Sequence, residues 1–256
     1  MIYVCIPVHN EARTVGLVLW KVRQVFTAFP REYQLLVADD ASTDATAEVL
    51  APYAKVLPMS VITHRERRGY AKSLEELLRL ALQQTDRPKR DAAITLHADF
   101  VHAPERMADL VKRLESGADL VVAEAAELRG RAPPSLRLAR RWAPRLLPVP
   151  GVRDTVSGFL ALRLSVLRQA LRRDPAPLLV TDGWCANAEL LARLAPHARR
   201  IESVPAAARW RTRQPGPRCS RTSCGCWNHE RGRGAWRGSD ASREAARRRE
   251  RGRAGA

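Results

Sequence analysis

The stretch QLLVADDASTD, residues 34–44, joins an apolar run to a group of acidic and hydroxyl side chains. Its first five residues are mostly apolar, which is typical of a short buried strand. We expect this strand over 34–38, ending at Asp39-Asp40. Ser42 or Asp44 can cap the helix that follows, because both side chains accept hydrogen bonds from backbone N–H groups. The stretch therefore predicts a strand, a polar turn and a helix in that order.

Strand and helix patterns alternate on both sides of this stretch. Short apolar runs predict further strands over residues 2–7, 56–63, 92–96 and 120–123. Apolar residues at helical spacing predict helices, which cover 13–29, a segment from Gly69 onward, and 104–115. Strands separated by helices form a mostly parallel sheet with helices on both faces, so we expect an α/β fold of this kind.

Polar side chains directly follow three of the predicted strands. The clusters are His9-Asn10-Glu11, Asp39-Asp40 and His97-Ala98-Asp99. Ligands of parallel α/β sheets bind outside the carboxyl ends of the strands, so three clusters at one edge indicate a binding site. No glycine-rich phosphate loop follows the first strand, and no Gly-x-x-x-x-Gly-Lys-Ser/Thr motif occurs. These absences argue against dinucleotide oxidoreductases and P-loop enzymes.

The chain of 256 residues is strongly basic, with 44 Lys and Arg, 27 Asp and Glu, and a formal charge of +17. Such a charge favours anionic partners: phosphates, nucleic acid or an acidic membrane surface. The body has no aromatic-basic recognition motif, so we expect no specific nucleic-acid partner. No apolar run of about 18 residues and no signal-peptide pattern occur. Five Cys lack a framework spacing, and we expect a cytoplasmic chain with reduced thiols.

Residues 214–256 differ in composition from the rest of the chain. They hold 11 Arg and seven Gly but no Val, Ile, Leu, Met, Phe or Tyr. So little apolar surface cannot offset the entropy of ordering, and we expect a disordered Arg/Gly-rich tail after a domain over 1–213. The tail is a tether for anionic surfaces, a solvated tail without a partner, or an out-of-frame translation of a GC-rich gene. Its Cys and His residues do not have a usual zinc-site spacing.

Six short motifs occur in order along residues 2–213. They are IPVHNE (6–11), DDASTD (39–44), RERRGYA (65–71), ITLHADFVHAPE (94–105), DTVSGF (154–159), and Val204-Pro205 followed by Arg211. Together they resemble the motifs of the family 2 glycosyltransferases, and within that family those of the synthases that load mannose or glucose onto a polyprenyl phosphate. The resemblance implies the glycosyltransferase A type of nucleotide-diphospho-sugar transferase fold. It also implies an inverting transfer of a hexose from a nucleotide-diphospho-sugar to a polyprenyl phosphate lipid.

The same resemblance implies a set of donor-binding residues, which are Pro7, His9, Glu11, Asp39, Asp40, Gly69, Ala98, Arg137 and Arg211. Carboxylates accept hydrogen bonds from base N–H and ribose hydroxyl groups, and guanidinium groups bind phosphates. Asp99 is the implied catalytic metal ligand for Mg²⁺ or Mn²⁺, together with His97, which stands where the family has an acidic residue. His97 has a second interpretation, as a ring packed beside the sheet. His102 is expected in a surface loop.

The implied acceptor side comprises Asp154, Ser157, Gly158 and Glu189. A lipid phosphate is already anionic near neutral pH and needs no strong base, whereas a sugar hydroxyl would benefit from one. Asp182 is the candidate catalytic base for a hydroxyl acceptor, or a turn residue beside Gly183. Glu189 is either an acceptor contact on a helix or a structural ion-pair partner.

Residues 133–148 have the pattern of an amphipathic helix rich in Arg. This helix either touches an anionic membrane or packs on the domain with Arg137 aimed at phosphate. With a lipid phosphate acceptor, the chain would make peripheral contact with the inner face of the cell membrane. Two alternatives stay open: the same donor with a saccharide hydroxyl acceptor, and a degenerate protein that only binds nucleotide sugars.

Overall fold

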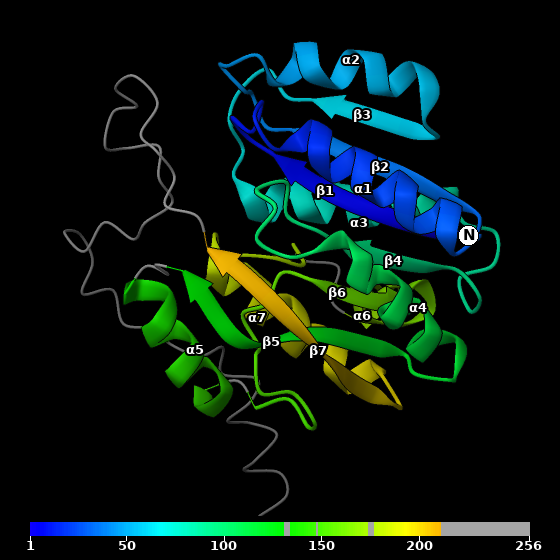
Figure 1. The fold of residues 1–256 in the computed structure, drawn as a ribbon. Coiled ribbons are helices and arrows are strands. Elements are labelled where there is room, and N and C mark those ends of the chain that lie inside the picture. The colour runs from blue at the N-terminus through cyan, green and yellow to red at the C-terminus, as the bar shows by residue number, and fades with distance from the viewer. Residues whose placement is uncertain (131–133, 147, 174–176, 211–256) are drawn as a thin grey trace, which may run out of the picture. The chain divides into compact units, whose positions relative to one another are not determined.

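A computed structural model describes residues 1–130, 134–146, 148–173 and 177–210, which form one seven-stranded sheet with helices on both faces (Figure 1). The strands are β1 (Ile2–Val8), β2 (Tyr33–Asp39), β3 (Met59–Thr63), β4 (Ala92–Thr95), β5 (Leu120–Gly130), β6 (Leu160–Arg163) and β7 (Ile201–Trp210). The helices are α1 (Val15–Ala28), α2 (Thr46–Val56), α3 (Tyr70–Gln84), α4 (Met107–Glu115), α5 (Pro134–Leu146), α6 (Leu164–Arg173) and α7 (Trp184–Leu194). Short 3₁₀ turns, η1 (Pro104–Arg106) and η2 (Ala195–His197), precede α4 and follow α7.

The sheet has the order β3-β2-β1-β4-β6-β5-β7, and every neighbouring pair is parallel except those that involve β6. β6 runs antiparallel to both β4 and β5, with Ala161 opposite Ile94 on one side and Val121 on the other. The predicted mostly parallel sheet is therefore confirmed. β6 and β7 have no counterpart among the predicted strands.

Two predicted strand boundaries are wrong. The strand expected from Val56 begins at Met59, because Val56 is the last residue of α2 and the Leu57 N–H still donates to the Tyr53 carbonyl at 2.9 Å. The strand expected over 120–123 extends to Gly130, because β7 pairs with β5 along that whole length.

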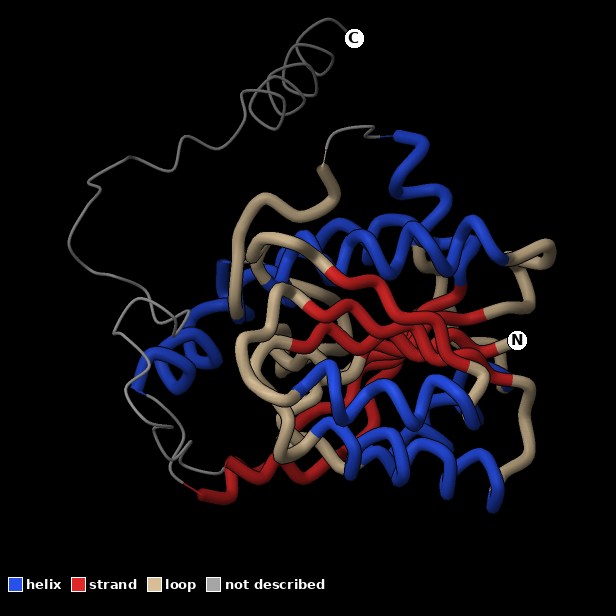
Figure 2. The backbone as a smooth tube through the Cα atoms, turned by 90° about the horizontal axis from the view of Figure 1, so that it is seen from above, coloured by secondary structure: helices blue, strands red, loops and turns tan. Residues whose placement is uncertain are grey.

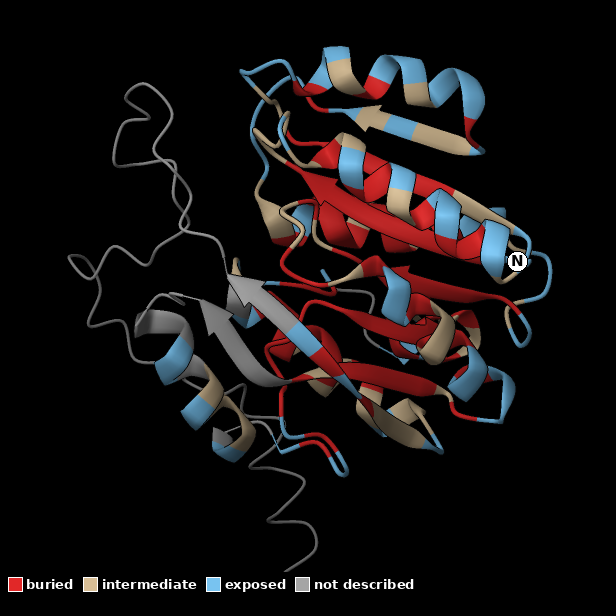
Figure 3. Cartoon of the chain, viewed as in Figure 1, coloured by how far each residue is buried: buried red, intermediate tan, exposed pale blue. Residues whose placement is uncertain are grey.

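Alternate residues of β1 face opposite layers of the protein. Even-numbered residues from Ile2 to Val8 belong to one buried cluster, while Tyr3 and Cys5 belong to another. A strand with a side-chain period of two can be apolar throughout only if both faces of its sheet are covered. Helices α1, α2 and α4 contribute to the first cluster, and α3, α6 and α7 to the second. Figure 2 shows helices on both faces of the sheet. The central strands are accordingly buried (Figure 3).

Residues 211–256 lie outside the described residues, so the predicted tail and the placement of Arg211 stay predictions. Within the part of the chain that the structure describes, no helix combines the length and the apolar character needed to cross a membrane.

Candidate functional site

The loops after β1, β2 and β4 start at neighbouring positions of one sheet edge. Val8 is paired with Asp39, so β1 and β2 end at the same level, and β4 ends at Thr95, which is paired with Cys5 three residues before the end of β1. We call residues 9–14, 40–45 and 97–103 the loop cluster. The prediction that the three polar groups follow strands ending at one edge is thereby confirmed.

Side chains of the first loop bind the second loop directly. The His9 ring nitrogen Nδ1 lies 2.7 Å from the Asp40 carbonyl oxygen. The Asn10 N–H donates to the Ser42 hydroxyl at 2.9 Å, and the Asn10 side-chain oxygen accepts from the Thr43 N–H at 2.8 Å. These bonds hold the two loops together at the carboxyl end of the sheet.

Each loop of the cluster contains one non-glycine residue in the left-handed region. The φ angles are +54° at Asn10, +52° at Ala41 and +58° at Phe100. Such a backbone conformation is uncommon for residues with a Cβ and costs about 1–3 kcal/mol. Strained backbone of this kind concentrates at functional sites, where the surrounding structure enforces it. Its repetition in three adjacent loops indicates a ligand site at this edge.

The buried Asp40 carboxylate organises the loop before α3. Its Oδ1 accepts hydrogen bonds from His64 Nδ1 at 2.9 Å and from the Arg68 N–H at 2.7 Å, and its Oδ2 accepts from the Gly69 N–H at 2.9 Å. Burial by itself would raise the pKa of Asp40, but these three hydrogen bonds outweigh it and hold the pKa below its usual value. Neighbouring Asp39 is also buried and accepts from the Ser42 N–H at 3.1 Å.

His64 is a site residue that the sequence reasoning missed. Its Nε2 lies 2.8 Å from Glu76 Oε2, so the ring bridges the carboxylates of Asp40 and Glu76. No local pattern identifies this bridge, because Glu76 lies on α3, twelve residues further along the chain.

Gly69 and Asp182 lie against each other at the start of α3. Gly69 has φ +93°, and a Cβ there would be 2.8 Å from Asp182 Oδ2, so a glycine is needed both for the turn and for the close approach. Asp182 Oδ1 accepts from the Ala71 N–H at 3.0 Å, in the first turn of α3. The predicted base thus satisfies one of the free N–H groups at a helix N-terminus.

His97 and Asp99 occupy the loop after β4. Asp99 Oδ1 accepts from the Val101 N–H at 3.0 Å. The His97 ring stacks on Tyr70 with centroids 5.1 Å apart, and its Nε2 lies 3.4 Å from the Tyr70 hydroxyl. A Cβ at Gly158 would overlap the same nitrogen. Burial lowers the pKa of His97, although nearby Asp99 opposes the shift.

The prediction of a surface position for His102 is wrong. This side chain is buried, with its ring centroid 6.2 Å from that of His97 and 5.6 Å from that of Phe159. Burial, reinforced by His97 and Arg140, lowers the pKa of His102 to about 3, so the ring is neutral at physiological pH. The local sequence around His102 does not predict this, because the ring packs against a residue that is 57 positions away in the chain.

The motif at 154–159 packs against the end of β4 and the middle of β5. The Ser157 hydroxyl donates to the Ala123 carbonyl at 2.7 Å, and the Gly158 carbonyl accepts from the Thr95 hydroxyl at 2.8 Å. Tyr70 donates to the Asn187 side-chain oxygen at 2.8 Å and thereby ties α3 to α7. We call residues 154–159 and 178–189 the C-terminal cluster.

Asp154 pairs with an arginine of α5 that the sequence reasoning missed. Its buried carboxylate lies 3.0 Å from Arg140 Nη2 and also accepts from the Ala125 N–H at 3.3 Å. Burial raises the pKa of Asp154 despite the opposing charge of Arg140. Arg137, which the resemblance implies as a phosphate contact, is exposed. Both belong to one Arg-rich helix, and only the packing of α5 distinguishes them.

Glu189 holds the backbone of residues 180–181. One carboxylate oxygen accepts from the N–H groups of Val180 at 3.0 Å and Thr181 at 2.8 Å, and the other pairs with Arg193 at 3.0 Å. These bonds outweigh the effect of burial and lower the pKa of Glu189. This geometry agrees with the structural interpretation of Glu189 as an ion-pair partner.

The remaining predicted donor residues lie in or beside the loop cluster. Pro7 and Ala98 are buried, and Glu11 accepts a hydrogen bond from the Thr14 hydroxyl at 2.8 Å. No group of three or more His, Cys, Asp or Glu residues in the described ranges could hold a metal ion. A single carboxylate such as that of Asp99 nevertheless fits Mg²⁺ or Mn²⁺, because these ions often take their remaining ligands from phosphate and water.

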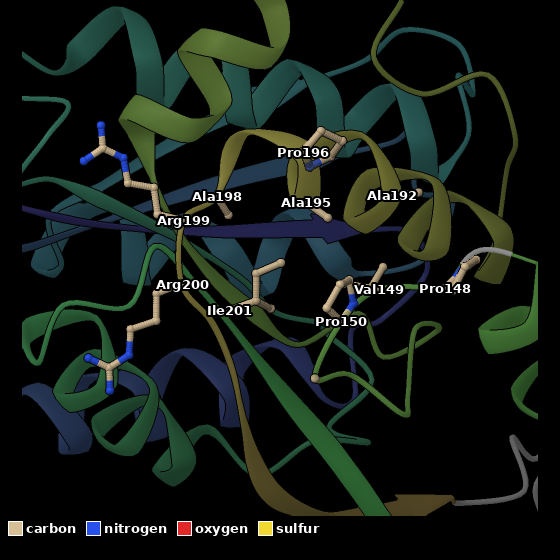
Figure 4. Close-up of a pocket in the computed structure, with 11 residues that line it drawn as sticks. Pro148, Val149, Pro150, Ala192, Ala195, Pro196, Ala198, Arg199, Arg200 and Ile201 are labelled. Carbon is tan, nitrogen blue, oxygen red and sulfur yellow. The ribbon is translucent and has the colours of Figure 1, made fainter. Parts of the chain in front are cut away.

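A pocket of about 710 Å³ lies away from these loops (Figure 4). It is lined by residues 148–151 and by residues of the segment 192–201. Ile201 starts β7, which runs parallel to β5, so this pocket adjoins the amino end of the strand rather than the carboxyl edge. The candidate site is therefore the loop cluster with the C-terminal cluster, not this pocket.

Comparison with known sequences agrees with the geometry. The family model described as Glycosyl transferase family 2 matches residues 3–148. An undecaprenyl-phosphate 4-deoxy-4-formamido-L-arabinose transferase from Photorhabdus laumondii is 31% identical over 118 residues, which are 46% of this chain and 35% of that protein. A dolichol-phosphate mannosyltransferase from Pyrococcus furiosus is 24% identical over 172 residues, covering 64% and 46% of the two chains. This chain thus spans less than half the length of these curated relatives.

Solved structures share the fold at low sequence identity. Glucosyl-3-phosphoglycerate synthase from Mycobacterium tuberculosis, in complex with phosphoglyceric acid, superimposes with a TM-score of 0.60 at 21% identity, covering 84% of this chain and 73% of that one. TarS 1–349 from S. aureus, in complex with UDP-GlcNAc, gives 0.58 at 18% identity, covering 83% and 59%. These similarities confirm the predicted glycosyltransferase A type of fold.

Proposed function

The chain belongs to glycosyl transferase family 2, and from this membership we propose that it transfers a sugar from a nucleotide-diphospho-sugar to a polyprenyl phosphate. The observation that carries the proposal is the loop cluster, where three polar loops follow β1, β2 and β4 at the edge used for ligand binding in such sheets. The names of the curated relatives, which include undecaprenyl phosphate and dolichol phosphate, support the lipid acceptor.

In the proposed reaction the loop cluster binds the nucleotide of the donor. His9 and Glu11 present polar groups to the base and ribose, and Asp40 acts through the backbone that it holds at Arg68 and Gly69. Strained loops that are already fixed in the free protein lower the entropy cost of binding the donor. Arg137 and Arg211 remain proposed phosphate contacts.

Asp99 is the proposed ligand for Mg²⁺ or Mn²⁺. A bound divalent cation would neutralise charge on the departing nucleoside diphosphate. His97 is proposed beside it and would have to ligate through Nδ1, because its Nε2 faces Tyr70 and Gly158. Imidazole suits Mn²⁺ better than Mg²⁺, so a contribution from His97 would favour Mn²⁺.

The proposed acceptor reacts as a phosphate oxygen. That oxygen forms a bond to the anomeric carbon, the bond from this carbon to the diphosphate breaks, and the configuration inverts. A lipid phosphate is anionic and needs no strong base. The carboxylates of Asp182 and Glu189 both accept hydrogen bonds from backbone N–H groups. This supports a phosphate acceptor, because such an acceptor needs neither carboxylate as a base.

Titration of the full chain with UDP-glucose and GDP-mannose, each with and without Mn²⁺, tests the donor site. We expect metal-dependent binding of one donor, lost in Asp99→Asn and kept in Asp109→Asn, whose side chain pairs with Arg106 on the surface. If the folded chain binds neither UDP-glucose nor GDP-mannose, transfer from these two donors is refuted.

Transfer assays then distinguish the acceptors. Sugar recovered on detergent-solubilised undecaprenyl phosphate supports the proposal, and sugar recovered on a saccharide supports the hydroxyl alternative. Donor binding without transfer to either acceptor would indicate a degenerate, binding-only protein.

A further inference from the structure

Helix α5 exposes an unusual combination of side chains. Leu138 is 60% exposed and Trp142 is 50% exposed, one helical turn apart. Arg137, Arg141 and Arg145 are exposed beside them. At about 100° per residue, all five side chains fall within an arc of about 140°. We call these five residues the outer face of α5, and the helix contains no acidic residue.

The opposite side of the helix is anchored to the protein. Arg140 is only partly exposed, pairs with Asp154 at 3.0 Å, and donates to the Ala125 carbonyl of β5. Figure 1 shows α5 beside the carboxyl half of β5. Ser157, in the same segment as Asp154, bonds to β5 two residues away, at Ala123. The inner contacts therefore link α5 to the C-terminal cluster while its outer face points to solvent.

Exposure of a Leu and a Trp on one turn is unfavourable in water unless another surface covers them. Arg145 lies over the Trp142 ring at 5.9 Å, which keeps a guanidinium beside the apolar pair. Trp and Leu flanked by Arg is the side-chain combination that binds at the boundary between lipid headgroups and acyl chains. The apolar pair and the arginines thus both favour a lipid surface as the partner.

Charge disfavours two other occupants of this face. A second copy of the chain docked through its own outer face would bring the same three arginines against each other. Residues 211–256 carry 13 Arg and only four acidic residues, so they would be repelled as well. An anionic occupant is favoured, and a lipid surface supplies both the negative headgroups and the apolar layer.

We propose that the outer face of α5 docks the protein on an anionic lipid surface, with Leu138 and Trp142 inserted and the three arginines on headgroup phosphates. The role of this docking rests on the proposed function, because docking would present the C-terminal cluster to a lipid acceptor. Binding to the surface itself requires neither donor nor acceptor.

Vesicle co-sedimentation of the full chain tests the proposal, with phosphatidylcholine vesicles and with vesicles of equal parts phosphatidylcholine and phosphatidylglycerol. We expect Leu138→Ser/Trp142→Ser to lower the affinity for the anionic vesicles about tenfold, and Arg137→Glu/Arg141→Glu/Arg145→Glu to lower it at least as much. Trp emission should shift to shorter wavelength on binding in the wild type, and this shift should shrink in Trp142→Phe.

Matched controls test whether vesicle binding depends on this face or on exposed apolar and basic residues in general. Leu17 and Trp20 on α1 are each 44% exposed, and Arg87, Lys89 and Arg90 form an exposed basic group at the opposite edge of the sheet. The corresponding Ser and Glu variants should bind vesicles like the wild type. Equal losses in these controls, or unchanged binding by the outer-face variants, would overturn the proposal.

Two further measurements keep the outcomes distinct. Circular dichroism and urea denaturation check that each outer-face variant is folded. If the variants change the oligomeric state and leave vesicle affinity unchanged, the face is an interface between copies and the proposal is refuted. If the wild type binds vesicles through α5 but transfers no sugar to lipid phosphate, the docking surface stands and the proposed function falls.

Discussion

The loop cluster and the C-terminal cluster sit beside each other but are built differently. In the loop cluster, polar side chains bind the backbone of an adjacent loop, as Asn10 binds Thr43. In the C-terminal cluster, polar groups bind segments far along the chain, as Asp182 binds Ala71, 111 positions away. The first two loops of the loop cluster are thus fixed by each other, whereas the C-terminal cluster depends on its fit to remote segments. Substitutions at the contacts between the two clusters should have the largest effects.

Gly158→Ala should break the C-terminal cluster most severely. The new Cβ would overlap Nε2 of His97, approach its Cδ2 to 2.6 Å and lie 2.9 Å from the Asn187 amide nitrogen. Overpacking of this kind costs about 3 kcal/mol of the free energy of unfolding, to be measured by urea denaturation. Gly16→Ala is the control, because its Cβ meets only side-chain atoms at 3.3 Å, and it should be nearly neutral.

The double variant Gly158→Ala/His97→Ala sharpens this test. Removal of the imidazole frees the space that the new Cβ needs, so the double variant should recover part of the stability lost in Gly158→Ala. Strictly additive losses would contradict the packing of His97 against Gly158.

Arg140→Ala should cost the next largest amount of stability. It leaves the buried Asp154 carboxylate without its counter-charge, and we expect a loss of about 2 kcal/mol in urea denaturation. Arg137→Ala, on the exposed side of the same helix, should change the free energy of unfolding by less than about 0.5 kcal/mol. Equal effects of the two substitutions would show that α5 is not anchored through Arg140.

Asp40→Asn tests the loop cluster through its pH dependence. The folded-state pKa of Asp40 is depressed, so its contribution to stability is present above the ordinary aspartate value of 3.8 and is lost as the pH falls through the lower folded value. Wild type should be more stable than Asp40→Asn by about 1.5 kcal/mol at neutral pH, and this difference should shrink below pH 3.8. Unfolding curves at several pH values measure it, and a difference that grows on acidification would contradict the prediction.

Asp182→Asn should have the smallest effect and distinguishes a helix cap from a base. Asparagine caps helices about as well as aspartate, so stability should change by only a few tenths of a kcal/mol, whereas Asp182→Ala should lose about 1 kcal/mol. Transfer to a lipid phosphate should stay within a few-fold of wild type in Asp182→Asn. A loss of about 100-fold, with stability kept, would instead assign Asp182 as a general base.

The same contrast separates what could be predicted from what could not. The strands that carry the loop cluster follow from local patterns, because apolar runs and the polar groups after them are adjacent in the chain. β6 escaped prediction since its four residues, Leu160–Arg163, run directly into α6 as one short apolar-rich stretch without turn residues between them. Such runs are ambiguous between strand and helix.

Side-chain partners were less predictable than strands. The resemblance singled out Arg137 as a phosphate contact, which stays a prediction. It gave no sign that Arg140 makes the buried pair with Asp154, because the rotation of α5 against β5 decides which arginine faces inward. His102 was expected at the surface, yet Phe159 and His97 enclose it. The sequence contains no signal for such contacts, which join residues of separate elements.

Local patterns in the chain were enough to predict the alternation of strands and helices and the positions of His9, Asp40 and Asp99 after strand ends. Both follow from the two-residue and 3.6-residue side-chain periods and from the common direction of parallel strands. The tertiary structure alone decided that β6 is reversed, that Asp40 binds His64, and that Asp182 caps α3. The physical reason is that a hydrogen bond or a close packing contact depends on distances of tenths of an ångström between remote segments, and only the folded chain sets those distances.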